Sequence, residues 1–126
     1  MSILIYSGAS EAATGWSERI IRATKPGQMI ERLKGAETLW RRLHSAIYDV
    51  QVGVLVIGTK GELEKISSFR EMFSSMPILL ILPDRDHETV SKGHRLHPRF
   101  LTYMDGDFME AFAVLERMLE RAERGR

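Results

Sequence analysis

A short polar loop near the amino terminus carries residues that could bind an anion. It reads Ser7-Gly8-Ala9-Ser10 and follows an apolar segment, so it lies where a strand would turn into a helix. Backbone N–H groups in such a loop can cradle a phosphate. The same residues also suit a tight turn in which Ser10 or Thr14 caps the following helix. The loop matches neither a Walker sequence nor a dinucleotide fingerprint, so both interpretations stay open.

Four aspartates follow two later apolar segments in close pairs. Asp84 and Asp86 form one pair, and Asp105 and Asp107 form the other. Carboxylates that meet at one edge of a sheet can hold a divalent cation. Asp86 and Asp107 also stand where helix N-caps are expected, and the other two fit turns. We therefore assign no metal site to them.

Histidines and one lysine complete the residues that could do chemistry. His87, His94 and His97 are close in sequence, but Pro98 interrupts the segment and no fourth metal ligand is evident. We expect these histidines to be solvated. Lys60 lies in a glycine-rich turn, which suits either contact with an anion or a plain surface turn.

Composition limits the classes of function. The 126 residues suit one domain, 1–126, with a core of its own. The absence of cysteine excludes a thiolate metal site and a cysteine nucleophile, and a formal net charge of +1 argues against direct binding of nucleic acid. The first apolar segment is too short for a signal peptide and the run 76–83 is too short to span a membrane. We expect a cytoplasmic protein without membrane contact.

Five apolar segments are predicted to form strands. Three of them are rich in β-branched residues or leucine and do not alternate with polar residues: Ile3–Tyr6, Gly53–Ile57 and Ile78–Leu82. Parallel strands that are covered on both faces have this pattern. Met29–Leu33 is half polar, as an edge strand would be, and Phe100–Met104 is the fifth segment.

The segments between these strands show helical periodicity. Their apolar faces are Trp16/Ile20/Ile21, Leu39/Trp40/Leu43/Ile47, Leu63/Ile66/Phe69/Phe73 and Phe108/Phe112/Leu115/Leu119. Residues 86–96 form the poorest helical segment, with Gly93 inside it. Asp107 and Gly125 stand where the last helix should begin and end. Strands and helices thus alternate five times, which predicts a three-layer, doubly wound α/β fold whose working edge is the carboxyl end of a parallel sheet.

Local sequence along the chain resembles the response-regulator receiver (CheY-like) family. Lys34–Leu39 is similar to the turn into its second helix, and Tyr48-Asp49 to the pair before its third strand. Met76–Leu80 is similar to its fourth strand and Phe100–Thr102 to its fifth. The resemblance covers nearly the whole chain. It implies a flavodoxin-like, five-stranded parallel sheet in the order 2-1-3-4-5.

The positions that carry receiver chemistry hold other residue types in this chain. Ser7 and Gly8 replace the acidic pair that binds Mg²⁺, and residues 54–60 contain no carboxylate to accept a phosphoryl group. Apolar or aromatic residues replace the hydroxyl and the lysine of the family. We call these positions the vestigial pocket: Ser7, Gly8, Gly58, Thr59, Lys60, Leu82, Tyr103 and Met104. No single replacement restores the metal site, the attacking carboxylate and the cation together.

The resemblance therefore implies a pseudo-receiver that is not an enzyme, needs no cofactor and works through protein contacts in bacterial signal transduction. Divergent receivers of this kind occur at the front of transcription activators, which implies a protein partner or an attached effector domain. Two alternatives stay open. One is a small-molecule or phosphate-binding domain that uses the Ser7–Ser10 loop. The other is a phosphocarrier similar to the sugar-transport IIB proteins, with Ser7 where they have cysteine.

The last helix suggests a homodimer. Receivers often pair through their fourth helix, fifth strand and fifth helix, and the last helix here has a wide apolar face. Apolar patches of this kind usually mark interfaces, and methionine suits adaptable contacts. A symmetric pair is the simplest assembly. The interface candidates are Met109, Phe112 and Met118, with Arg117 and Arg121 in a charged rim.

Overall fold

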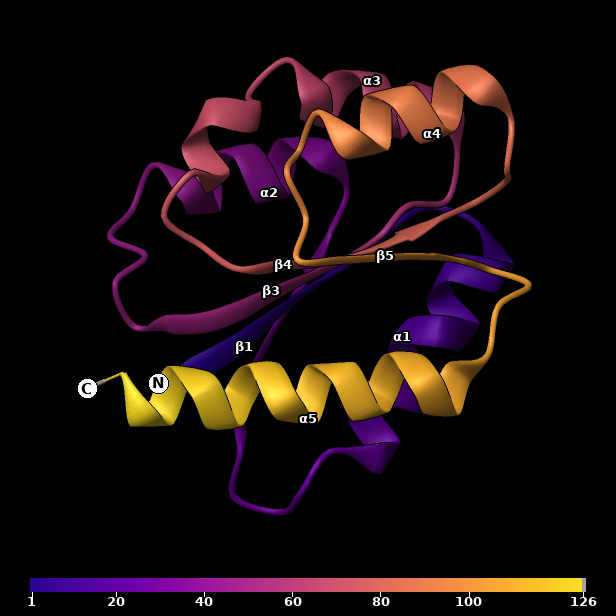
Figure 1. Ribbon diagram of the computed structural model, residues 1–126. Coiled ribbons are helices and arrows are strands. Elements are labelled where there is room, and N and C mark those ends of the chain that lie inside the picture. Colours follow the sequence, from indigo (N-terminus) through magenta and orange to yellow (C-terminus); the bar gives the residue numbers. More distant parts are fainter. Residues whose placement is uncertain (126) are drawn as a thin grey trace.

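A five-stranded parallel sheet forms the middle layer of the molecule (Figure 1). The computed structural model describes residues 1–125. The strands are β1 (Ser2–Ser7), β2 (Met29–Lys34), β3 (Val50–Val56), β4 (Ile78–Leu82) and β5 (Phe100–Tyr103). They lie in the order β2-β1-β3-β4-β5, and all neighbouring pairs are parallel. The predicted fold class and strand order are confirmed.

Helices cover both faces of the sheet, because parallel strands must be joined by crossovers. On one face lie α1 (Glu11–Ala23) and α5 (Phe108–Arg124). On the other face lie α2 (Ala36–Leu43), α3 (Lys60–Ser67), a short 3-10 helix η1 (Arg70–Phe73) and α4 (His87–His94). Among residues 1–125, no helix is both long and apolar enough to cross a membrane.

Each face of the sheet buries its own hydrophobic cluster, because successive strand residues point to opposite sides. Leu4 and Tyr6 of β1 pack beneath α2, α3 and α4, whereas Ile3 and Ile5 pack against α1 and α5. β3 and β4 are buried along their whole length. This burial on both faces explains why the central strands read as continuous apolar runs.

The boundaries of two strands differ from the sequence expectation. β3 begins at Val50, earlier than the predicted Gly53. The early start was not predicted because the polar Gln51 interrupts the apolar pattern. Gln51 is nevertheless buried, and its amide oxygen accepts a hydrogen bond from Gln28 at 3.2 Å. β5 ends at Tyr103, so Met104 lies in the following loop.

The third helical segment is divided. α3 ends at Ser67, and η1 carries Phe73 back to the core. The hydroxyl of Ser68 donates to the carbonyl of Lys65 at 2.5 Å. Such local side-chain bonds compete with continuation of a helix. The apolar periodicity identified the buried Leu63, Ile66 and Phe73 and the partly buried Phe69, but it could not locate this break.

α4 forms despite Gly93, and the glycine has a packing role. A Cβ at Gly93 would lie 2.9 Å from Cδ1 of Leu82 and 3.3 Å from Cδ1 of Leu101. Because glycine has no side chain, α4 can approach β4 and β5 closely at this point. Gly93 lowers the helical propensity of this segment, but it also allows the helix to pack closely against the sheet.

Candidate functional site

The loops that follow β1 and β3 meet at the carboxyl edge of the sheet, where doubly wound folds place their working residues. The backbone N–H of Gly8 donates to the carbonyl of Val56 at 2.8 Å. A Cβ on Gly8 would lie only 2.4 Å from the nitrogen of Gly58. Two positions of the vestigial pocket therefore touch backbone to backbone, and only glycine fits at Gly8.

The carboxylate of Glu62 fills the centre of this junction. Its Oε1 accepts hydrogen bonds from the N–H groups of Gly58 at 2.8 Å and Thr59 at 3.0 Å. Its Oε2 accepts from the N–H of Ala9 at 2.7 Å and from the hydroxyl of Tyr6 at 3.2 Å. We call this arrangement of one carboxylate and its donors the Glu62 cradle. Glu62 is not among the candidate residues that the sequence indicates.

Local sequence explains how Glu62 reaches this position. Thr59 is the N-cap of α3, and its Oγ1 accepts from the N–H of Glu62 at 3.2 Å. The N–H of Thr59 in turn donates to the Glu62 carboxylate, and the two bonds together form a capping box. The Thr-x-x-Glu spacing was a visible signal for the local half of the cradle. A carboxylate in the first turn also interacts favourably with the helix dipole.

Tyr6 closes the cradle from the strand side. Its side chain is fully buried within the sheet. Burial raises the pKa of the Tyr6 phenol far above its ordinary value, and the charge and hydrogen bond of Glu62 raise it further. The phenol therefore stays protonated and serves as a donor to the carboxylate.

The Ser7–Ser10 loop uses its polar groups within the chain. Ser10 is the N-cap of α1, and its Oγ accepts from the N–H of Ala13 at 3.1 Å, which confirms the capping interpretation. The hydroxyl of Ser7 donates to the carbonyl of Gly8 at 3.4 Å. The N–H of Ala9 belongs to the Glu62 cradle. The N–H groups of Gly8 and Ala9, which the sequence offered to a phosphate, thus donate within the chain, to the carbonyl of Val56 and to Glu62.

Lys60 lies at the first turn of α3 and forms an ion pair with Asp86 across two loops. The hydrogen bond and charge of Asp86 raise the pKa of Lys60. Asp86 is the N-cap residue of α4, as predicted, although its side chain makes no capping hydrogen bond. The backbone N–H of Asp86 donates to the carboxylate of Asp84 at 2.9 Å. Burial works to raise the pKa of Asp84, but hydrogen bonding to its carboxylate, first of all from this N–H, and the charge of Lys60 together lower it.

Arg85 covers the end of β5. Its guanidinium donates to Asp105 at 2.9 Å and lies 4.0 Å from the centroid of the Tyr103 ring. Asp107 caps α5 as predicted, accepting from the N–H of Met109 at 2.9 Å. The aspartates of this edge therefore face a cation or a backbone donor. Within residues 1–125, no three metal-ligating side chains gather.

The remaining positions of the vestigial pocket are structural. Leu82 is fully buried at the end of β4. The carbonyl of Met104 accepts from Nε1 of Trp16 at 2.9 Å, and the Trp16 ring lies 5.5 Å from that of Phe108. Trp16 is half-buried, and its hydrogen bond connects α1 to the segment between β5 and α5.

The histidines of the fourth helical segment do not converge. His87 and His94 are the first and last residues of α4, which places them about 10 Å apart along the helix axis. His97 follows in the loop to β5 with a left-handed φ of 52°. All three are exposed.

The interface candidates of α5 differ in exposure. Met109 is 65% exposed. Phe112 and Met118 are half-buried against the cluster beneath α1 and α5. Arg117 and Arg121 are exposed on the same helix. Of the three apolar candidates, Met109 is therefore the one best placed for an outside contact.

No family model and no curated protein matches the chain. Solved structures match it over nearly its whole length. The signal receiver domain of an HD domain-containing protein from Pseudomonas fluorescens Pf-5 has a TM-score of 0.69 at 15% identity, covering 99% of this chain and 93% of its own. The Mn²⁺-bound form of response regulator Rcp1 has a TM-score of 0.63 at 10% identity, with 94% and 91% covered. The chemotaxis response regulator CheY4 of Vibrio cholerae has a TM-score of 0.63 at 14% identity, with 94% and 99% covered.

These likenesses define the class of fold. The chain has the fold of a response-regulator receiver domain, as the sequence resemblance implied. At such low identity, the function must be argued from the residues at the carboxyl edge.

Proposed function

We propose that this chain is a regulatory domain that works through protein contacts, independently of phosphorylation and without catalysing a reaction. The observation that carries the proposal is the Glu62 cradle. The place where two loops present N–H donors at the carboxyl edge is filled by a carboxylate of the chain itself. These loops therefore need no bound anion to hold their conformation.

The residue types at this edge support independence from phosphorylation. An aspartyl phosphate needs an attacking carboxylate at the reacting position. β3 ends at Val56, and the fully buried Ile57 follows it. Both oxygens of Glu62 already accept hydrogen bonds. Ser7 and Gly8 supply no acidic side chain for a hard cation, which prefers carboxylate oxygens.

The hydrogen bonds of the Glu62 cradle favour a single conformation of these loops over a switch between two conformations. Hydrogen bonds to a charged group contribute about 1.5–3 kcal/mol each, more than neutral ones. Those of Glu62 join β1, the loop after β1 and the start of α3 in one network. A partner would therefore meet the same loop conformation at all times.

Exposed apolar side chains support contact with another protein. Tyr48 is 85% exposed, and Met29 and Met109 are each 65% exposed. Met109 lies on α5, the face that the receiver resemblance favours for pairing. We place a symmetric homodimer contact there, with Arg117 and Arg121 at its rim. The partner role extends to an effector domain in a cytoplasmic bacterial regulator, such as a transcription activator.

Intact-mass spectrometry tests the proposal. The protein is incubated with acetyl phosphate and Mg²⁺, beside an active receiver domain as the positive control. We expect the control to gain one phosphoryl group and this chain to keep its mass. A stoichiometric gain on a carboxylate of this chain would overturn the proposal.

A further inference from the structure

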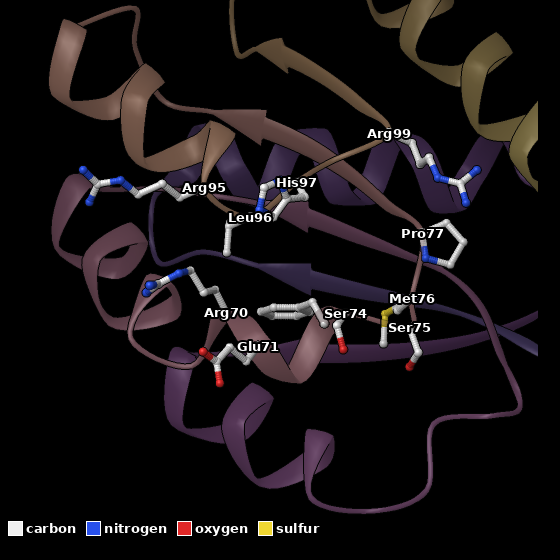
Figure 2. Close-up of a pocket in the computed structure, with 11 residues that line it drawn as sticks. Arg70, Glu71, Ser74, Ser75, Met76, Pro77, Arg95, Leu96, His97 and Arg99 are labelled. Carbon is white, nitrogen blue, oxygen red and sulfur yellow. The ribbon is translucent and has the colours of Figure 1, made fainter.

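A groove lies at the amino edge of the sheet, opposite the vestigial pocket (Figure 2). It has a volume of about 740 Å³. One wall is η1 with the segment that leads into β4, and the other is the segment between α4 and β5. Neither the Glu62 cradle nor the α5 surface contributes to it.

The groove is rich in unpaired cations. Arg70, Arg95 and Arg99 line it, and Glu71 is the one carboxylate in the lining. The structure shows no ion pair for these three arginines among residues 1–125. Arg70 donates to the carbonyl of Ser67 at 3.1 Å, which orients its guanidinium. Several other arginines of the chain do pair with carboxylates: Arg32, Arg41, Arg42 and Arg85.

The arrangement of the charges indicates an extended ligand. In Figure 2 the guanidinium groups of Arg70 and Arg95 point toward one side, and that of Arg99 points toward the other. A single small anion can meet only one of these ends. Between them the exposed part of the lining is uncharged: Ser74 and Ser75 are exposed and Pro77 is half-buried, whereas Leu96 and Met76 are only 4% and 6% exposed.

The chemistry of the lining favours a peptide over a nucleic acid. A guanidinium fork matches a carboxylate with two parallel hydrogen bonds. Single-stranded nucleic acids bind by stacking bases on exposed aromatic rings. Phe73 lines the groove, but its side chain is only 2% exposed, so it provides no stacking surface.

The backbone of the groove is also unusual. His97 lies in the lining between Leu96 and Arg99 and has a left-handed φ of 52°. A residue other than glycine stays in this region only where the surrounding structure holds it, and such residues cluster at functional sites. Its N–H donates to the carbonyl of His94 at 3.0 Å, which fixes the turn.

We propose that this groove binds an acidic peptide segment of a partner protein, with carboxylates at both ends and an uncharged middle. The site goes beyond the proposed function, because its residues are separate from the cradle. It would stand even if the carboxyl edge proved able to accept a phosphoryl group.

Fluorescence anisotropy with a defined peptide tests the groove on the full chain. The probe is a labelled peptide with glutamates at both ends and uncharged serines and alanines in the middle, and the same peptide with glutamine in place of glutamate is its control. Two variants change the groove: the groove double variant carries Arg95→Glu and Arg99→Glu, and a single variant carries Glu71→Gln. The control is the α1 double variant, Arg19→Glu with Arg22→Glu, which makes the same change in net charge as the groove double variant but lies outside the groove.

The groove proposal predicts that the groove double variant weakens binding of the acidic peptide by about tenfold or more, since two charge reversals act together. Glu71→Gln strengthens binding, and the α1 double variant binds nearly as the unchanged protein does. The proposal is overturned if the two double variants lose affinity equally or if the glutamine peptide binds as well. It is also overturned if pyrophosphate or a single-stranded oligonucleotide displaces the peptide at lower concentration than an unlabelled acidic peptide.

Discussion

Oε2 of Glu62 lies 2.7 Å from the backbone nitrogen of Ala9, although 53 positions separate the two residues in the sequence. This contact connects the first turn of α3 to the loop after β1. It places an anion of the chain itself at the edge where related folds do their chemistry.

Replacing Glu62 should destabilise the fold. Glu62→Ala leaves the N–H groups of Ala9, Gly58 and Thr59 without their acceptor, and we expect a loss of about 2–4 kcal/mol. Urea unfolding measures the change. Glu64→Ala, an exposed position on the same helix, is the matched control and should change stability by less than about 0.5 kcal/mol. Equal effects of the two substitutions would contradict a structural role for the cradle.

Gly8 should not tolerate a side chain. In Gly8→Ala the new Cβ would lie 2.4 Å from the nitrogen of Gly58 and 2.5 Å from Oε1 of Glu62. We expect a loss of more than about 2 kcal/mol, because backbone must shift and the cradle opens. Gly15→Ala in α1 meets nothing within 4 Å and should stabilise the fold by about 0.5–1 kcal/mol. Thermal unfolding of both variants checks the opposite signs.

Tyr6 should make stability sensitive to alkaline pH. The pKa of its phenol is raised in the folded state, so its contribution is fully present below the unfolded pKa of about 10 and is lost as the pH rises above it. Tyr6→Phe removes this ionisation together with the hydrogen bond to Glu62, which lowers stability at neutral pH by about 1 kcal/mol.

Urea unfolding between about pH 8 and pH 12 distinguishes these effects. The unchanged protein should lose stability above about pH 10 more steeply than Tyr6→Phe, by up to about 1.4 kcal/mol per pH unit. Parallel pH profiles for the two proteins would show that Tyr6 ionises in the folded state as it does in the unfolded chain.

Self-association should depend on α5. Met109 and Met29 are equally exposed at 65%, but Met109 lies on α5, whereas Met29 lies at the start of the edge strand β2. In sedimentation equilibrium the unchanged protein should dimerise at high micromolar concentration. Met109→Glu should remain monomeric because it places a charge in an apolar contact, whereas Met29→Glu should still pair. A monomer mass for the unchanged protein across the concentration range would remove the dimer.

The elements of the fold were predictable where the signals are local. The last helix begins after Asp107 and its C-cap is Gly125, as the sequence indicated, because N-capping and helix termination depend on neighbouring residues. The central strands were evident because burial on both faces requires continuous apolar runs. The break after Ser67 was not predicted, since Phe69 and Phe73 keep the apolar period across it.

The candidate site was harder to predict because its contacts join distant segments. The Ser7–Ser10 loop could be located, and the capping role of Ser10 could be predicted from its neighbours. Thr59 and Glu62 match the capping-box spacing, but the sequence gives no sign that the same carboxylate also reaches Ala9. Asp86 is the N-cap residue of α4 as predicted, but the sequence gives no sign that its carboxylate pairs with Lys60 rather than with the helix backbone.

Hydrogen exchange at the backbone amides of Ala9 and Gly58 tests the central claim most directly. In the ligand-free protein, NMR should show both amides exchanging slowly, because the Glu62 carboxylate accepts their hydrogens. Exchange at both should become fast in Glu62→Ala and stay slow in Glu64→Ala, and adding Mg²⁺ with beryllium fluoride should leave the unchanged protein as it was. Fast exchange at both amides in the unchanged protein, slowed by Mg²⁺ and beryllium fluoride, would contradict the claim that the chain fills this site with its own carboxylate.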